Sequence, residues 1–186
     1  MARPSRIEGY AIVSTDGMLA DAQGQIPAAL KVEADQEFFH RGLARAAAVV
    51  HGRHSSESDP PDPDRPRLIA TRTVAAIARD PAQPKALWWN PRGASLEEAW
   101  TALAPPPGML AVIGGPEVYG LFLAIGYDAF HLSRVPNLRL PGGRPVFPEI
   151  GPDRSPEDVL AGRGLEPGPR QVLDAAAGVT LVSFER

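Results

Sequence analysis

The sequence predicts an α/β fold with a mostly parallel central sheet, helices on both faces and an antiparallel C-terminal edge. Short β-rich segments alternate with helical patterns, which is typical of one sheet covered on both faces. The β-rich segments are Tyr10–Ser14, Ala48–Val50, Leu68–Ala70, Ala86–Trp89, Leu110–Ile113, Ala129–Ser133 and Val179–Phe184. The chain has 186 residues, a length typical of one domain, and we expect a single domain over 1–186.

Prolines divide these segments, since 21 of them occur and they cluster. Segments 59–67 and 105–108 must be loops, because proline removes a backbone donor and restricts the residue before it. Segments 136–148 and 162–169 are interpreted in the same way as irregular surface chain.

Three helices are expected between the strands. The first runs from about Glu33 to Ala44. The second opens at Ser95, which forms a capping box with Glu98. The third begins at Pro116, a residue tolerated in the first helical turn, and continues to about 125.

Composition excludes several classes of protein. The chain is 44% hydrophobic and 22% charged, with a net charge of −3, which indicates a globular protein. It has neither a bilayer-length apolar stretch nor an export signal, so a cytoplasmic protein without membrane contacts is expected. The sequence has no run of Lys and Arg that would indicate nucleic-acid binding. The absence of cysteine and of an HExxH pattern argues against a metal site. We expect a small-molecule partner and a monomer or homodimer.

The segments that follow three strands suit phosphate. They are Gly52-Arg53-His54-Ser55, Thr71-Arg72-Thr73 and Gly114-Gly115. In an open α/β sheet, ligands bind at the carboxyl ends of strands, and a helix N-terminus attracts anions. Two anion sites fit the pyrophosphate and the 2′-phosphate of NADPH. The alternative is a plain Gly-Gly turn with solvated arginines, since neither GxGxxG nor GxxxxGK[ST] follows a strand.

One carboxylate faces the apolar side of the first helix. At 100° per residue, Asp35 projects on the same face as Phe38, Phe39, Gly42 and Leu43, whereas Glu33 and Glu37 point away. A half-buried carboxylate has a raised proton affinity unless it is paired, which suits a proton donor or an anchor for a cationic heterocycle. The alternative is a first-turn aspartate that interacts with the helix dipole.

Other conspicuous side chains are expected to be structural. Trp88, Trp89 and Trp100 should pack in the core, because aromatic residues dominate cores. His51 and His54 lie on either side of a glycine turn and are not expected to bind a metal.

Several strings resemble the dihydrofolate reductase-like superfamily over nearly the whole chain. Segment 49–58, VVHGRHSSES, resembles its V-I-M-G-R-x-T-x-E-S, and segment 112–119, VIGGPEVY, resembles its V-I-G-G-x-x-V-Y. Segment 15–20 with 24–27 resembles the mobile loop over the nicotinamide, and 145–148, PVFP, matches a further family segment. In orthodox members tryptophan follows the loop proline, whereas Ala28 stands here.

The resemblance implies roles for particular residues. Asp35 and Phe39 would contact a pterin, Ser133 would bond to the acid and the pterin amino group, and Arg65 would bind the folate carboxylate; Ile12 would also contact substrate. An ungapped alignment would choose Glu33 as the acid. Gly114 and Gly115 would form a cis peptide bond beside the nicotinamide. The implied NADPH-binding residues are Gly52, Arg53, His54, Ser55, Thr71, Arg72, Ile113, Gly114, Gly115, Glu117, Val118, Tyr119 and Ala20.

The expected function is an NADPH-dependent reductase that transfers hydride to a pterin, from 7,8-dihydrofolate to tetrahydrofolate. Segments 14–20 and 141–147 also resemble the reductase domain of riboflavin synthesis, so the alternative is a ribosylamino-pyrimidine reductase or another heterocycle reductase. That alternative requires a cation for the ribose phosphate, such as Arg139 or Arg144. A third possibility is a non-catalytic nucleotide-binding domain.

Overall fold

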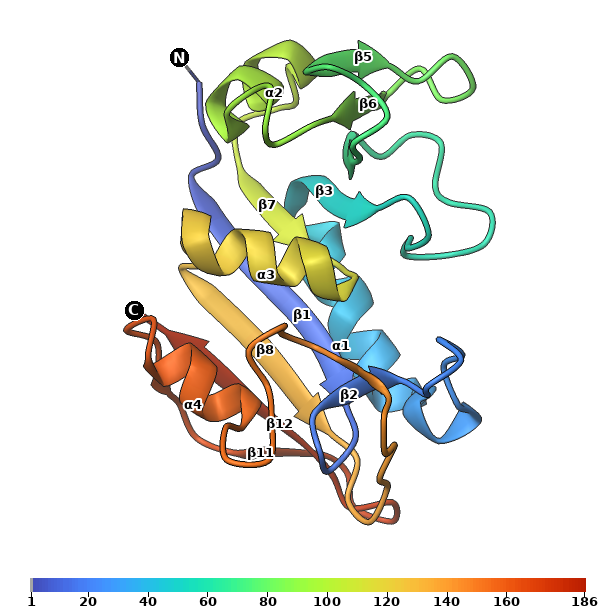
Figure 1. Ribbon diagram of the computed structural model, residues 1–186, viewed down its shortest axis with the longest axis vertical. Helices are drawn as coiled ribbons and strands as arrows, with labels where there is room; N and C mark the ends of the chain where they lie inside the picture. Colours follow the sequence, from blue (N-terminus) through green and yellow to red (C-terminus); the bar gives the residue numbers. More distant parts are fainter. Residues whose placement is uncertain (1) are drawn as a thin grey trace.

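The computed structural model describes residues 2–186 and contains one ten-stranded sheet, in the order β10-β12-β8-β1-β7-β3-β4-β6-β5, with β11 paired to β12 (Figure 1). The strands are β1 (Arg6–Val13), β3 (Ala46–Gly52), β4 (Arg67–Ala70), β5 (Ile77–Arg79), β6 (Ala86–Trp89), β7 (Met109–Val112), β8 (Ala129–Arg134), β10 (Glu166–Pro167), β11 (Gln171–Asp174) and β12 (Val179–Glu185). The strands from β8 to β6 in this order are parallel. The predicted mostly parallel sheet with an antiparallel C-terminal edge is confirmed, because β12 pairs antiparallel with β8.

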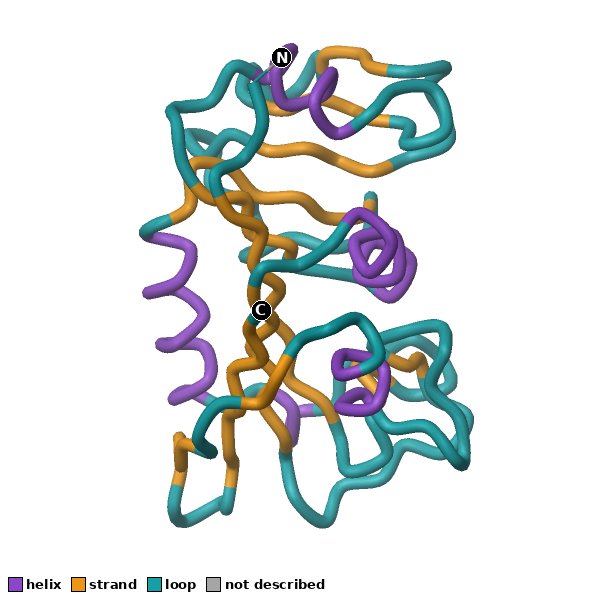
Figure 2. The backbone as a smooth tube through the Cα atoms, turned by 90° about the vertical axis from the view of Figure 1, so that its left-hand side faces the viewer, coloured by secondary structure: helices purple, strands orange, loops and turns teal. Residues whose placement is uncertain are grey.

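Helices cover both faces of the sheet, as predicted. Viewed along the sheet, α1 lies alone on one side and α3 and α4 lie on the other (Figure 2). The helices are α1 (Glu33–Ala44), α2 (Leu96–Leu103), α3 (Pro116–Ile125) and α4 (Pro156–Ala161), with a 3-10 turn η1 (Ala28–Leu30) before α1.

The helix boundaries agree with the signals at their ends. The Ser95 side chain accepts a hydrogen bond from the Glu98 amide, and the Glu98 side chain accepts one from the Ser95 amide, so the predicted capping box is present. Pro116 occupies the first turn of α3, as expected. The short helix α4 was not predicted, although Ser155 and Asp158 form a second capping box before it.

The core has a large and a small layer on opposite faces of the sheet. The large layer packs strand residues such as Val50 and Val112 against aromatic residues of α2 and α3, including Trp100 and Phe122. The small layer packs Tyr10, Leu43, Val49, Met109 and Ala111 under α1. Adjacent residues of β3 therefore enter opposite layers, which makes β3 apolar on both faces like other parallel strands.

Two predictions about the chain path were wrong. The stretches 136–148 and 162–169 are not simply irregular surface chain, because Val146, Phe147 and Leu165 are buried. Short strands also form there: β9 (Arg144–Pro145) pairs with β2 (Met18–Ala20) in a second sheet, and β10 pairs with β12. These apolar residues are isolated among prolines and enter the core one at a time. No hydrophobic periodicity in the sequence therefore predicts that they are buried.

Strand β1 begins at Arg6 rather than at Tyr10, where the prediction placed it. The polar residue Glu8 concealed the strand, yet its side chain is buried and accepts hydrogen bonds from Arg6 and Tyr10. A buried carboxylate that is paired in this way is compatible with an interior strand. Among residues 2–186, no helix is long and apolar enough to cross a bilayer.

Candidate functional site

A cavity of about 1430 Å³ opens at the carboxyl ends of the parallel strands. It extends from α1 and the β2–β9 sheet to the loops that follow β4 and β6. The predicted site residues that line it are Ile12, Ala20, Asp35, Phe39, Gly52, Arg53, His54, Ser55, Thr71, Arg72, Ile113, Gly114, Gly115, Glu117, Val118, Tyr119 and Ser133. Segments far apart in the sequence therefore converge on one cleft, as the position of ligands in open α/β sheets predicts.

The α1 end of the cleft contains Asp35. Asp35 is half-buried beside Phe38 and Phe39, whereas Glu33 is exposed, so the predicted orientation of the helix is confirmed. Across from it, Ile12 of β1 pairs with Ser133 of β8. A carboxylate and a hydroxyl thus meet between apolar walls, which is an arrangement that can hold a flat, polar heterocycle.

The proton affinity of Asp35 is altered by this environment. Burial raises the pKa of Asp35, and the hydrogen-bonding Ser133 side chain offsets part of that effect. Nearby, burial and the Asp35 charge raise the pKa of Tyr119, so its hydroxyl stays protonated. That hydroxyl donates to the carbonyl oxygen of Tyr10. Asp35 is therefore a carboxylate in this part of the cleft whose proton affinity exceeds that of a free aspartate.

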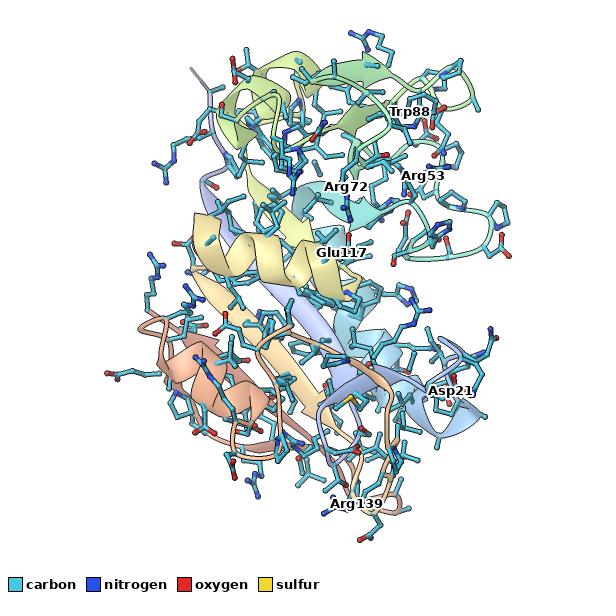
Figure 3. The ribbon with its side chains drawn as sticks, in the orientation of Figure 1. Asp21, Arg53, Arg72, Trp88, Glu117 and Arg139 are labelled. Atoms are coloured by element: carbon cyan, nitrogen blue, oxygen red, sulfur yellow. The ribbon has the colours of Figure 1, made fainter. Side chains whose placement is uncertain are left out.

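The opposite end of the cleft presents cations and hydroxyls. The chain turns after β3, where the Ser55 amide donates to the Gly52 carbonyl at 3.2 Å. After β4, the Thr71 and Thr73 hydroxyls lie 2.9 Å apart. Figure 3 shows Arg53, Arg72 and Glu117 gathered beside β3. Nη2 of Arg72 lies 3.0 Å from a Glu117 carboxylate oxygen, in an exposed ion pair.

Gly114 and Gly115 lie between the two ends, and the peptide bond that joins them is cis, as the resemblance implied. Gly114 has a φ of +129°, which L-residues with side chains rarely adopt. Helix α3 follows immediately, with Gly115 at its N-cap position. Its first turn therefore directs backbone N–H groups and a partial positive charge into the cleft.

These residues fit a dinucleotide with an additional phosphate. Gly114 and Gly115 have no side chains, so their backbone is open to a ligand in the cleft that they line. The N-terminus of α3 suits a pyrophosphate, and Arg53 and Arg72 suit a separate phosphate. The cleft volume of about 1430 Å³ exceeds that of ordinary single-ligand pockets and can hold a cofactor beside a substrate.

Arg65 is the predicted site residue that the structure places elsewhere. Its Nη1 donates to the carbonyl oxygen of Leu43 at 2.8 Å, and its Nε lies 3.7 Å from Oε1 of Glu57. The prediction that it lines the substrate site was wrong. The Leu43 carbonyl in the last turn of α1 and the buried carboxylate of Glu57 both attract the Arg65 guanidinium away from the cleft.

The cleft also contains residues that the sequence reasoning missed. Asn90, Pro91 and Arg92 line it, and they follow β6 directly. The rule that identified the other three strand ends would have found them. Tyr10 and His131 also line the cleft, but strand residues of this kind give no separate signal.

Arg139 and Arg144, the two cations considered for a ribose phosphate, occupy different parts of the structure. Arg144 lines the cleft, and a Cβ on Gly24 would lie 2.7 Å from its guanidinium, so it packs across the loop that follows β2. Arg139 lies at the opposite end of the molecule from Arg53 (Figure 3). Of these two arginines, Arg144 lines the cleft and Arg139 does not.

The remaining predictions concern structural residues. Trp89 and Trp100 are buried in the core, whereas Trp88 is half-buried in β6. Residues 2–186 contain no cluster of His, Asp or Glu with the arrangement of a metal site.

Comparisons with known proteins show where this fold recurs. No protein-family model and no curated protein sequence matches the chain. Among solved structures, a protein assigned to riboflavin biosynthesis from Shewanella sp. PV-4 matches with a TM-score of 0.67 and 18% identity, over 97% of this chain and 98% of that one.

Two further structures are similar. A pyrimidine reductase-like protein from Corynebacterium diphtheriae has a TM-score of 0.65 and 18% identity, over 97% of this chain and 91% of that one. A diaminohydroxyphosphoribosylaminopyrimidine deaminase/5-amino-6-(5-phosphoribosylamino)uracil reductase from Thermotoga maritima has a TM-score of 0.66 and 16% identity, and the match spans 98% of this chain but 56% of that longer one. The chain therefore has the dihydrofolate reductase-like fold that its motifs led us to expect.

Proposed function

We propose that this protein is an NADPH-dependent reductase that transfers hydride to a carbon–nitrogen double bond, and that its substrate is a ribosylamino-pyrimidine of the riboflavin type, reduced at C1′ of its open-chain imine form. The observation that supports the proposal is a single cleft in which a phosphate-binding end and the Asp35 end meet at Gly114–Gly115. This arrangement would place a nicotinamide against a ring held by Asp35.

Each group has a distinct task in this reaction. NADPH supplies the hydride, and the protein supplies orientation and electrostatics. Arg53, Thr71 and Arg72 hold the 2′-phosphate, and the N-terminus of α3 holds the pyrophosphate. Asp35 and Ser133 orient the polar edge of the heterocycle, and the raised pKa of Asp35 lets it carry a proton to the nitrogen bonded to the carbon that receives the hydride. Phe39 packs against the ring.

The cations of the cleft favour a phosphorylated pyrimidine over dihydrofolate. Dihydrofolate needs a partner for its glutamate carboxylate, and Arg65 is bound to Leu43 and Glu57 instead. A ribose phosphate needs a cation in the cleft, and Arg144 lines it. Two of the similar structures are named as pyrimidine reductases or reductase-like proteins, which agrees with this choice.

Dihydrofolate remains the second candidate because of one observation. Asp35 and Phe39 lie one helical turn apart on the same wall of the cleft, opposite Ser133, as the resemblance to pterin-reducing enzymes requires. This wall would hold a pterin as well as it holds a pyrimidine.

The test follows NADPH absorbance in the near ultraviolet with purified protein and one of two substrates. We expect NADPH oxidation with 5-amino-6-(5-phosphoribosylamino)uracil and none with dihydrofolate. Arg144→Ala should raise KM for the phosphorylated substrate, whereas Arg139→Ala serves as the matched control and should not. Oxidation with dihydrofolate alone would establish the second candidate. Tight NADPH binding without NADPH oxidation in the presence of either substrate would identify a nucleotide-binding domain instead.

A further inference from the structure

The connection between β3 and β4 has no regular secondary structure, although its first residues form the phosphate-binding end of the cleft. It runs from Arg53 to Pro66, and Arg53, His54 and Ser55 line the cleft. Long connections without helix or strand are usually either functional or disordered. What holds this one in place decides whether its first three residues can receive a phosphate.

A buried ion pair anchors the connection to the sheet. Nη1 and Nη2 of Arg67 donate to Oε2 and Oε1 of Glu57 at 2.9 and 2.6 Å. The side chains of Arg67 and Glu57 are only 1% and 4% exposed. Burial opposes ionisation of Glu57, but the Arg67 hydrogen bonds outweigh it and lower the pKa of Glu57 to about 2. The pair is therefore charged at neutral pH and in the two-bond geometry that fixes orientation best.

Hydrogen bonds continue from this ion pair to the centre of the cleft. Nη1 of Arg67 lies 3.1 Å from Nε2 of His51, and Nδ1 of His51 lies 2.7 Å from the carbonyl oxygen of Gly52. Since Arg67 can only donate, Nε2 of His51 accepts its hydrogen bond. The proton of the His51 ring is therefore on Nδ1, which donates to the Gly52 carbonyl oxygen. The Gly52 amide then donates to the Gly114 carbonyl at 2.9 Å. The chain of contacts reaches from Glu57 to the Gly-Gly turn.

The far end of the connection converges on the same carboxylate. Nη2 of Arg67 also donates to the carbonyl oxygen of Asp62 at 2.8 Å, and the Asp62 amide donates to Oε1 of Glu57 at 3.2 Å. Arg65 approaches Oε1 of Glu57 from the side of α1. Glu57 thus ties together both halves of the connection, β4 and the end of α1. We refer to Glu57, Arg67 and His51 as the Glu57 clamp.

We propose that Glu57 and Arg67 are positioning residues that fix the turn at 53–55 in the shape that receives the 2′-phosphate, so that the Glu57 clamp sets the preference for NADPH over NADH. This inference rests on the proposed function. Neither residue lines the cleft, so each acts through the backbone that leads to Arg53 and Ser55. Weakening the clamp lets the turn move away from the phosphate. Gly114, Gly115 and α3 stay in place, because the Ile113 amide donates to the Val50 carbonyl at 3.0 Å and the Tyr119 amide donates to the Gly115 carbonyl at 2.9 Å.

The experiment titrates NADPH and NADH by fluorescence into wild type, Glu57→Asp and Glu57→Gln. The aspartate keeps the charge but is one methylene too short to reach Arg67 without moving the turn. We expect the ratio of the two dissociation constants to fall by about tenfold or more, with NADH affinity nearly unchanged. Asp64→Asn is the matched control. Asp64 lies in the same connection and forms a 3.0 Å ion pair with Lys85, which precedes β6, but its side chain is 87% exposed. It should keep the wild-type ratio.

A second readout separates positioning from loss of the fold. Amide hydrogen exchange without cofactor should speed up at residues 53–58 and 62 in the Glu57 variants and stay unchanged at 71–73, with thermal unfolding measured for each variant. Arg67→Lys keeps the charge with fewer hydrogen bonds and should give an intermediate ratio. If wild type binds neither nucleotide, the proposed function is wrong, and the exchange pattern alone still tests the clamp. A folded Glu57→Asp with the wild-type ratio and wild-type exchange would overturn the inference.

Discussion

At the scale of single residues, position on an element predicted more than residue type did. Asp35 was distinguished from Glu33 by the face of the helix on which it projects, and the structure places Asp35 in the cleft and Glu33 in solvent. Arg65 was assigned through the resemblance alone, and the structure places it on Glu57 and Leu43. A helix face follows from local geometry, whereas the partner of a long side chain in a loop depends on contacts that the sequence does not encode locally.

Replacement of Asp35 tests its role as the group that orients and protonates the substrate. Asp35→Asn should lower kcat by roughly 10²–10⁴-fold, the usual contribution of a positioned acid or base, and leave NADPH affinity nearly unchanged. Steady-state kinetics and cofactor titration check this expectation. Glu33→Gln, on the exposed face of the same helix, is the control and should keep full activity. Wild-type turnover in Asp35→Asn would remove Asp35 from the mechanism.

The same variant should gain stability at neutral pH. Burial raises the folded-state pKa of Asp35 above its usual value of 3.8. Such a group stabilises the fold fully below its unfolded pKa, and that contribution is lost as the pH rises through the folded pKa. Asparagine has no charge to bury, so Asp35→Asn should melt at a higher temperature than wild type at pH 7. The difference should disappear below the usual pKa, and calorimetry across that range measures it.

Cofactor selectivity tests the cationic end of the cleft. Arg53→Ala combined with Arg72→Ala should abolish the preference for NADPH over NADH, because charge-assisted hydrogen bonds to a phosphate contribute about 1.5–3 kcal/mol each. Titration with both nucleotides measures the effect, and unchanged NADH affinity in the same variant shows that the cleft is intact. A preserved preference would contradict the assignment of these arginines.

At the scale of elements, close packing on the sheet fixes where α1 lies. Gly42 of α1 packs against Tyr10 of β1, so that a Cβ on Gly42 would lie 2.5 Å from the tyrosine hydroxyl oxygen. That hydroxyl donates to Glu8 at 2.7 Å, and Glu8 lies 3.2 Å from Nε2 of His131. The contact between Gly42 and Tyr10, whose hydroxyl bonds to the buried Glu8, therefore fixes how closely α1 approaches the sheet. Asp35 lies on this helix.

Gly42→Ala tests this contact and separates two opposed effects. Alanine in a helix interior is favoured over glycine by about 0.8–1.0 kcal/mol, but overpacking of a core costs typically 1–3 kcal/mol. Since the ring atoms of Tyr10 are also within 2.6 Å of the new Cβ, we expect net destabilisation in urea denaturation. Gln36→Gly at an exposed position of α1 measures the propensity term alone. A stabilised Gly42→Ala would show that α1 can shift freely on the sheet.

Elements with a local signal were predictable, and those stabilised by distant contacts were not. Helix α1 and strand β6 have the predicted boundaries, and α3 begins at the predicted Pro116. Strands β5, β10 and β11 were missed, because they are short edge strands that form only when a neighbour supplies their hydrogen bonds. The cleft was largely predictable because the carboxyl ends of parallel strands converge, whereas its outermost cation, Arg144, is fixed by the β2–β9 pair.

At the scale of the whole molecule, two buried carboxylates make the stability depend on pH. Burial opposes ionisation of Glu8 and Glu57, but hydrogen bonds from His131, Tyr10 and Arg6 in one case, and from Arg67 in the other, lower the pKa of each to about 2 from 4.5. A depressed folded-state pKa contributes stability above the unfolded pKa, and the contribution is lost as the pH falls toward the folded pKa.

We therefore expect the free energy of unfolding to fall steeply between about pH 4.5 and pH 2. Urea denaturation at a series of pH values should show a smaller slope for Glu57→Gln and for Glu8→Gln than for wild type. Asp64→Asn removes an exposed carboxylate and should retain the wild-type slope. Equal slopes in all four proteins would show that these buried ion pairs do not control acid stability.

The order of strands in the sheet affects how the chain can fold during its synthesis. Strand β1 is at the centre of the sheet between β7 and β8, which begin at Met109 and Ala129, and β8 is completed by β12 at the C-terminal end of the chain. A nascent chain in which β7 and β8 have not yet been made therefore exposes an apolar strand without either neighbour, which invites aggregation or chaperone binding. The cleft is assembled from the carboxyl ends of those same strands, so the growing chain acquires its ligand site only after β8 has been made.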